Sequence, residues 1–331
     1  MSSSDRQITK SDCIVIGGGI TGLIIANILQ RKGIKVTVLD KGKDIGGRLA
    51  TRRIRKEDSV EGIFDYGGQY FTVKNPQFQV WVNHWLKHNV VKQWFSSADG
   101  KPCYCGVNGT RGIVKYLAKN LEVYSKTKAI EVNYDKKWSI KTEGDREYQG
   151  DMLVMTPPVP QSLSLLDSSL IPIPLEIRFA LEQIEYDSCI AVLALLEKPS
   201  IIPSPGGISL ENNSVAWLGD NYQKGISPQG YAVTLHASSK FSNEYWNSDD
   251  AEIAYKLITA GADYLDSPVI KYQVHRWRYS VPKTFYNEPC LALLELPLVM
   301  AGDAFVAPTI EGAVISGMAA GELIGQRFGV N

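Results

Sequence analysis

The fold of this chain is decided near its start, by the stretch Cys13-Ile-Val-Ile-Gly17-Gly-Gly19-Ile20-Thr21-Gly22. Its first four residues are apolar and predict a short buried strand over 12–16, and a helix is predicted over 23–32. Between them the glycines have the spacing Gly-x-Gly-x-x-Gly. Gly17 allows a tight turn, Gly19 lets the backbone approach a pyrophosphate, and Gly22 lets the helix pack closely on the strand. The N–H groups at the helix N-terminus then face the phosphates of a dinucleotide.

The next strand completes this fingerprint. Residues 35–39 predict a second parallel strand, and it ends at Asp40. A carboxylate at this position accepts hydrogen bonds from ribose hydroxyls and disfavours a 2′-phosphate on the same dinucleotide. We therefore predict a βαβ unit that binds a dinucleotide, with a purely structural turn as the alternative interpretation.

Length and composition exclude several classes of protein. The chain has 331 residues, which suggests about two domains. Lys and Arg total 35, as do Asp and Glu, and this balance argues against a nucleic-acid binder. The sequence has no apolar run of about 18 residues and no secretory signal pattern at its start. The five cysteines lack zinc or redox spacing, so we expect a cytoplasmic protein without a metal site.

The remaining pattern divides the chain into two interleaved parts. We interpret residues 41–75 as extended loops and predict helices within 76–95, 112–120 and 312–328, with strands within 121–155, 189–197, 231–237 and 296–300. The two ends of the sequence then form one nucleotide-binding domain, and the middle supplies a second. The predicted segments are 1–75, 121–160 and 291–331 for the first domain, and 76–120 and 161–290 for the second.

Three further motifs are rich in glycine. Gly46-Gly47-Arg48 lets an extended backbone pass close to a cofactor while the arginine neutralises pyrophosphate, although a turn with solvated arginines fits equally well. Asp65-Tyr-Gly-Gly-Gln69-Tyr70 is typical of a loop against a flat ring, or of a tight hairpin. Gly302-Asp303 precedes Gly312-Ala313-Val314, which opens the last helix. The dipole of that helix suits an electron-rich ring edge.

In this order the motifs resemble those of FAD-dependent oxidoreductases of the flavin amine oxidase superfamily, and within it the renalases. The stretches that carry the resemblance are Cys13–Gly22, Asp40–Arg48, Phe64–Tyr70, Asp151–Pro160, His275–Ser280 and Ala301–Ala320. The resemblance implies an α/β fold: a Rossmann-like FAD-binding domain with an inserted, β-rich, mixed α+β substrate domain, as in amine-oxidase-like and p-hydroxybenzoate-hydroxylase-like proteins. Ala313 stands where a cysteine would be needed for attachment, so non-covalent FAD is expected.

The resemblance also implies roles for individual residues. Thr21 and Arg48 would contact the diphosphate, Ala129 the adenine end, and Asp303 the ribityl-phosphate region. Residues 311–314 would approach the pyrimidine edge, and Gln69 and Tyr70 would lie against the isoalloxazine. The full expected cofactor set is Gly17, Gly19, Ile20, Thr21, Gly22, Asp40, Lys41, Gly47, Arg48, Gln69, Tyr70, Ala129, Thr156, Gly302, Asp303, Glu311, Gly312, Ala313 and Val314.

Renalases as a family oxidise the 2- and 6-dihydro isomers of NAD(P)H to NAD(P)+ by hydride transfer to flavin N5, and O2 is reduced to H2O2. The resemblance therefore implies an isomeric dihydronicotinamide nucleotide and O2 as substrates. This chemistry removes no proton, so it requires stacking and orientation rather than a strong base. The residues expected at the reacting centre are Gln69, Tyr70, His236, Trp277, Arg278 and Tyr279. Arg276 or Arg278 would meet the substrate phosphates, with a surface salt bridge equally compatible, and a core histidine is the alternative for His236.

Four other functions compete with this one. A nicotinamide dehydrogenase explains the first fingerprint but not Gly302-Asp303. A flavin reductase with its own NAD(P)H domain would need a second Gly-x-Gly-x-x-Gly, which the middle of the chain lacks. A flavin amine oxidase acting on a small amine often has a lysine near flavin N5, and no matched motif here supplies one. The fourth is a non-catalytic flavoprotein that serves as an assembly or binding factor.

Overall fold

The computed structural model describes residues 8–56, 59–211, 213–293 and 295–329. The chain divides into two compact units. The first contains residues 1–47, 114–185 and 282–331, and the second contains residues 48–113 and 186–281. Each unit is therefore assembled from segments that are far apart in the sequence.

The first unit is built on a six-stranded sheet with the order β18-β19-β12-β2-β3-β8. All neighbours are parallel except β18, which runs antiparallel at the edge. From β2 the chain continues to β3 on one side, and β12 lies on the other, so the order reverses beside the turn after β2. In open α/β sheets this reversal is where ligands bind. The strands are β2 (Cys13–Ile16), β3 (Val36–Leu39), β8 (Glu122–Tyr124), β12 (Met152–Met155), β18 (Leu291–Ala292) and β19 (Leu298–Met300).

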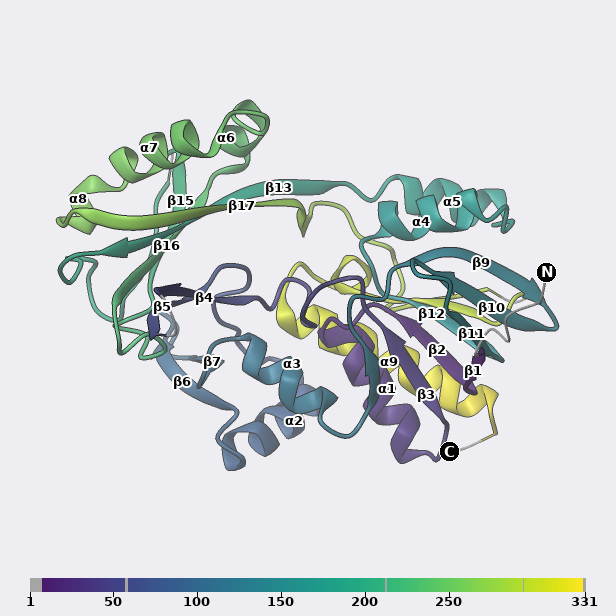
Figure 1. Cartoon of the computed structure of the whole chain (residues 1–331). Coiled ribbons are helices and arrows are strands. Elements are labelled where there is room, and N and C mark those ends of the chain that lie inside the picture. Colours follow the sequence, from purple (N-terminus) through teal and green to yellow (C-terminus); the bar gives the residue numbers. More distant parts are fainter. Residues whose placement is uncertain (1–7, 57–58, 212, 294, 330–331) are drawn as a thin grey trace. The chain divides into compact units, whose positions relative to one another are not determined.

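Two helices of the first unit pack side by side, α1 (Ile20–Arg31, purple) and α9 (Ile310–Arg327, yellow) (Figure 1). Gly317 and Gly321 of α9 face Ile24 and Ile28 of α1, whose side chains lie about 3.1–3.3 Å from where a Cβ would be. The glycines thus let the helix backbones approach closely. The hydroxyl of Thr21 also donates to the carbonyl oxygen of Ala313 at 3.0 Å.

A second, four-stranded sheet of the first unit has the order β1-β11-β10-β9. The side chain of Trp138 in β10 is buried, and its Nε1 donates to Pro297 O, just before β19. The strands are β1 (Ile8–Lys10), β9 (Ala129–Asp135), β10 (Lys137–Thr142) and β11 (Glu147–Gly150), and the unit also holds α4 (Val159–Ser168), α5 (Leu175–Glu182) and the 3-10 turn η1 (Asp303–Phe305).

The second unit is built on a five-stranded sheet with the order β14-β15-β16-β13-β17. One face forms an apolar core with the helical segment 239–265, and the other packs Leu193 and Leu195 against Phe64 and Tyr66 of the β4–β5 hairpin. The elements are β4 (Thr51–Lys56), β5 (Ser59–Asp65), α2 (Pro76–Lys87), β6 (Val91–Ser96), β7 (Pro102–Gly106), β13 (Tyr186–Leu196), β14 (Gly207–Ser209), β15 (Val215–Asp220), β16 (Tyr231–Ala237), α6 (Ser239–Glu244), α7 (Asp250–Ala260), α8 (Ala262–Leu265) and β17 (Val269–Pro282), while α3 (Arg111–Ala118) crosses from this unit to the first.

The expected α/β class with a Rossmann-like domain is confirmed. One local prediction is wrong, because the stretch 41–75 holds the β4–β5 hairpin. The helix predicted within 76–95 is α2, which ends at Lys87 before β6. The compact units also differ from the expected segments, because residues 48–75 lie in the second unit, and residues 114–120, 161–185 and 282–290 lie in the first. The hairpin belongs there because Ile54 and Phe64 are buried against β13. Among the described helices, none combines the length and the apolar character that a membrane crossing requires.

Candidate cofactor and substrate residues

The turn after β2 has little room for side chains. Gly17 has φ +111, and a Cβ there would collide with Thr156 Oγ1, while a Cβ on Gly22 would collide with Gly17 O. At Gly19 the opposite holds, since no described atom lies within 4 Å of the Cβ position. Gly19 is the N-cap of α1, no described side chain caps the helix, and its first turn has no acidic residue. The open N–H groups at this helix end suit a phosphate.

Asp40 closes the same turn from the end of β3. One carboxylate oxygen accepts the Gly18 N–H at 2.7 Å, and the other accepts the Gly42 N–H at 2.6 Å. The Gly46 N–H donates to Gly18 O at 2.9 Å, so the second glycine motif lies beside the first. The ammonium of the neighbouring Lys41 donates to Gln161 Oε1 at 2.9 Å. A bare helix end ringed by glycine backbone is the arrangement that a dinucleotide pyrophosphate needs, so these residues fit the expected group.

The start of α9 packs against the start of α1, where Thr21 donates to Ala313 O. The hydroxyl of Thr309 accepts the Gly312 N–H at 2.9 Å, and a Cβ at Gly312 would collide with Ala307 O. Asp303 is buried, and the preceding Gly302 N–H donates to Ser316 Oγ. Ala129 begins β9 in the four-stranded sheet. Two residues earlier, the Thr127 N–H donates to Asp40 O at 2.8 Å, which brings this part of the chain beside the glycine turn.

Arg48 begins the second unit, directly after Gly47. Its guanidinium donates to Ser280 O at 3.0 Å, and its carbonyl oxygen accepts the Gly68 N–H at 2.9 Å. A Cβ on Gly67 would collide with that same carbonyl. Within the second unit, Arg48 is therefore packed against the motif around Gln69.

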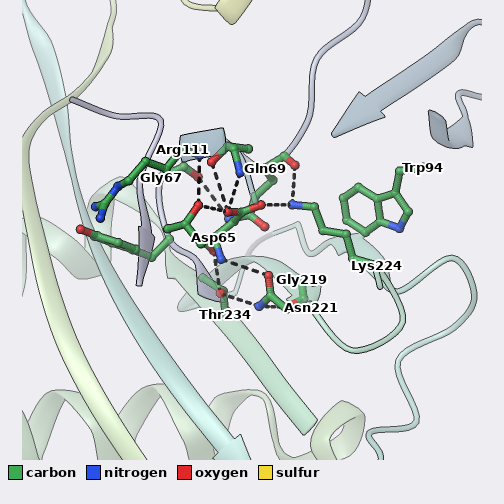
Figure 2. Close-up of polar contacts among 12 residues, drawn as sticks. Asp65, Gly67, Gln69, Trp94, Arg111, Gly219, Asn221, Lys224 and Thr234 are labelled. Carbon is green, nitrogen blue, oxygen red and sulfur yellow. Dashed lines mark hydrogen bonds and ion pairs between the residues drawn. The ribbon is translucent and has the colours of Figure 1, made fainter. Parts of the chain in front are cut away.

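The interior of the second unit holds a buried ion pair that sequence reasoning missed. The carboxylate of Asp65 and the ammonium of Lys224 lie 2.8 Å apart, and both side chains have zero exposure. Asp65 also accepts from Thr51 and from the backbone and hydroxyl of Thr110, while Lys224 donates to Gln69 O at 2.6 Å (Figure 2). Charges this deep are stable only when paired and hydrogen-bonded. No motif marks Lys224, which lies between β15 and β16, outside the stretches that carry the resemblance to renalases.

Gln69 and Tyr70 have different surroundings. Gln69 is 7% exposed, and its amide nitrogen donates to Asp65 O at 2.7 Å and Gly67 O at 3.2 Å. Tyr70 is 37% exposed and makes ring contacts with Trp94, Phe95 and Trp217. Burial is the main cause that raises the pKa of the Tyr70 phenol, so Tyr70 is a neutral aromatic surface at physiological pH.

His236 and Trp277 meet at one backbone oxygen. Trp277 Nε1 donates to Tyr66 O at 2.8 Å, and His236 Nε2 lies 3.1 Å from the same oxygen. Because a carbonyl only accepts, His236 carries its proton on Nε2. Desolvation lowers the pKa of His236 to about 4, so the imidazole is neutral at physiological pH. The rings of Tyr66 and Trp277 stack with 5.3 Å between centroids.

The remaining residues expected at the site lie on β17, whose side chains point alternately to the two faces of the sheet. His275 and Trp277 contact Tyr66 on the hairpin side, and Tyr279 meets Tyr186 with 5.6 Å between ring centroids. Successive side chains of a strand point to opposite faces. Arg276 accordingly binds Asp250 and two carbonyls near Trp246, and Arg278 lies over the Trp246 ring at 5.3 Å. The side chain of Arg278 therefore lies on the helix-covered face, opposite to that of Trp277, and its expected role at the reacting centre stays a prediction.

The chain is similar to known proteins over nearly its whole length. Residues 15–85 match the model of the NAD(P)-binding Rossmann-like domain, and residues 84–324 match that of the flavin containing amine oxidoreductases. The chain is 25% identical to renalase of Mus musculus over 93% of its own length and 97% of that protein. It is 41% identical to amine oxidase B of Homo sapiens over 18% of this chain and 11% of the other. A solved structure from Exiguobacterium sp. 255-15, assigned as a protoporphyrinogen oxidase, is 13% identical and covers 99% of this chain with a TM-score of 0.73, which supports the fold.

Proposed function

Because the chain belongs to the flavin-containing amine oxidoreductases and is an FAD-dependent oxidoreductase, we propose that it oxidises the isomeric 2- and 6-dihydro forms of NAD(P)H to NAD(P)+. The observation that carries this proposal is the extent of similarity to a renalase, which covers both units. The similarity to amine oxidase B spans 18% of the chain. A match of that length supports a common type of cofactor domain and says nothing about substrate.

The first unit would hold the FAD. We propose that its diphosphate lies at the N-terminus of α1, beside Gly19, Ile20 and Thr21, where the helix has no side-chain cap. Asp40 would take a ribose hydroxyl, since each of its oxygens accepts one hydrogen bond and has lone-pair capacity left. The other residues of this unit proposed to line the cofactor are Gly17, Gly22, Lys41, Gly47, Ala129, Thr156, Gly302, Asp303, Glu311, Gly312, Ala313 and Val314. Arg48, the first residue of the second unit, is also proposed as a cofactor residue.

The second unit would hold the dihydronicotinamide. When bound, FAD supplies the acceptor for a hydride, and O2 takes the two electrons onward as H2O2. The chain then has to orient a flat ring and keep water away, and no proton must be removed from the substrate. Gln69, Tyr70, His236, Trp277 and Tyr279 are the proposed substrate residues.

The charge state of these residues supports the proposal. His236 is neutral because its pKa is lowered to about 4. Lys224, the buried lysine near Gln69, is bound to Asp65 and to Gln69 O, so its ammonium is held in an ion pair. An amine oxidase is served by a base or an unprotonated lysine near the substrate nitrogen, whereas a dihydropyridine needs neither. The free cysteines support the cytoplasmic location that we propose.

The test is anaerobic mixing of the purified FAD protein with defined substrates. Separate reactions contain a mixture of dihydronicotinamide isomers, ordinary NADH or NADPH, and a panel of small amines, and bleaching of the visible flavin bands is followed. We expect fast bleaching with the isomers alone, followed by H2O2 formation when O2 is admitted. Bleaching by amines and not by the isomers would overturn the proposal in favour of an amine oxidase.

A further inference from the structure

The side-chain amide of Gln69 is fixed in one orientation. Its nitrogen donates to Asp65 O and Gly67 O, at 2.7 and 3.2 Å. The reverse orientation would place the amide oxygen against two carbonyl oxygens, so the assignment is chemically determined. The amide oxygen Oε1 is buried and accepts no hydrogen bond from any described residue.

A second buried polar atom lies beside it. The indole Nε1 of Trp217 is buried and donates to no atom among the described residues. A Cβ on Gly219 would lie 2.9 Å from Gln69 Oε1 and 3.0 Å from Trp217 Nε1. An acceptor and a donor therefore border the same bare stretch of β15 backbone, on the sheet face where His236 is the cross-strand neighbour of Trp217.

The surroundings hold this pair rigidly. Lys224 binds Gln69 O and Asp65 together, so the backbone of residue 69 is anchored to a buried ion pair (Figure 2). On the other side Asn221 binds Gly219 O and Thr234, and Thr234 donates to Asp65 O. Backbone anchored in this way keeps the positions of residue 69 and of the β15 segment pre-organised, so a ligand that matches the pair loses less free energy to reordering.

The chemistry of the pair defines its ligand. Buried polar atoms without partners are costly, so a group that offers both a donor and an acceptor on adjacent atoms is favoured. A primary carboxamide does this, because its N–H would meet Gln69 Oε1 and its carbonyl oxygen would meet Trp217 Nε1. We infer that Gln69 and Trp217 recognise the carboxamide of the nicotinamide substrate. This inference rests on the proposed function and makes both residues determinants of specificity.

Binding of oxidised dinucleotides tests this recognition separately from turnover. The affinity of the FAD-loaded protein is measured by calorimetry for NAD+ and for its 3-acetylpyridine analogue, which keeps the carbonyl and loses the N–H. We expect NAD+ to bind at least about tenfold more tightly, which corresponds to about 1.4 kcal/mol. Gln69→Met should bind both dinucleotides equally. Trp217→Phe should weaken both by a similar factor and keep the preference for NAD+.

A matched control comes from the same aromatic cluster. Trp94 also contacts Tyr70, but its Nε1 donates to Pro205 O at 2.8 Å. Trp94→Phe therefore removes an indole N–H outside the pair and should leave the preference for NAD+ intact. Flavin content and the unfolding midpoint of each variant are recorded alongside.

Three results would overturn the inference. One is equal affinity of the wild type for the two dinucleotides, or no measurable binding. Another is loss of FAD from Gln69→Met or Trp217→Phe, which would assign the pair to the cofactor. The third is an unchanged preference for NAD+ in Gln69→Met. If the dihydro isomers failed to bleach the flavin, the proposed function would be contradicted instead. The ratio of the affinities for NAD+ and its 3-acetylpyridine analogue could still be measured, so the two failures are distinguishable.

Discussion

The glycine turn of the first unit and the Asp65–Lys224 network of the second are built in opposite ways. The turn is made of backbone, and the residues around it lie mostly within 17–46, with Thr156 as the main distant contributor. The network is made of buried side chains from β4, β5, the loop before α3, and the segment between β15 and β16. Backbone recognition leaves a short pattern of glycines in the sequence, whereas a network of side chains leaves none. The two regions should therefore fail differently when they are altered.

The largest effect is expected at the backbone site. Gly17→Ala adds a methyl group that collides with Thr156, at a residue whose φ is positive. We expect strain of about 1–3 kcal/mol in the apoprotein. We also expect the purified protein to lose bound FAD. Flavin absorbance per mole of protein measures this loss. Gly112→Ala is the control, since no described atom lies within 4 Å of its Cβ position. A fully yellow Gly17→Ala protein would contradict the backbone account.

The next effect concerns the buried ion pair. Lys224→Met leaves the Asp65 carboxylate buried beside its hydroxyl and amide donors, and we expect the free energy of unfolding to fall by about 3–5 kcal/mol. Urea denaturation gives the value. The double variant Asp65→Asn with Lys224→Met removes both charges and should recover part of the loss. If the double variant lost more free energy of unfolding than the two single variants together, electrostatic pairing would not be the cause.

A smaller effect is expected from pH at His236. The unfolded histidine takes up a proton below its ordinary pKa of 6.5, whereas the folded one stays neutral until about 4 because of desolvation. The unfolded state therefore binds more protons in this interval, and the free energy of unfolding falls by at most about 3 kcal/mol as pH drops from 6.5 to 4. His236→Asn should remove that share of the slope in urea denaturation series. His275, whose pKa is also lowered to about 4, keeps its own share. Identical slopes in the two proteins would refute the assignment.

The smallest effect is expected at the surface of the first unit. Lys141 and Glu131 face each other across β10 and β9 at 2.8 Å, and both side chains are about half exposed. Lys141→Met should change the free energy of unfolding by less than about 1 kcal/mol, because water and salt screen the pair. Because Lys→Met is made at both positions, the loss in free energy of unfolding can be compared directly between the exposed Lys141 and the buried Lys224. Equal losses at both positions would show that burial does not decide the outcome.

The sequence was informative where structure is local. The strand, turn, helix and strand over 12–40 were predicted correctly, since apolar runs and glycine spacing determine them within thirty residues. The β4–β5 hairpin was missed because β4 contains three arginines, and only pairing with β5 and burial of Ile54 make it a strand. Lys224 was missed because its partner Asp65 is distant in sequence. Alternation along β17 places Arg278 opposite to Trp277, but which of the two faces the helical segment 239–265 covers depends on packing between distant parts of the chain.

The division of each unit into separated segments has a consequence for synthesis on the ribosome. β2 and α1 are among the first elements made, yet β19 and α9, which pack against β12 and α1, come from residues 298–327. At roughly 5–20 residues per second, the nascent N-terminus waits about 15–60 seconds for them. The second unit is complete in sequence at residue 281, before the first. β2 and α1 are therefore translated well before β19 and α9, and until then the apolar surface of α1 that packs on α9 lacks its native partner.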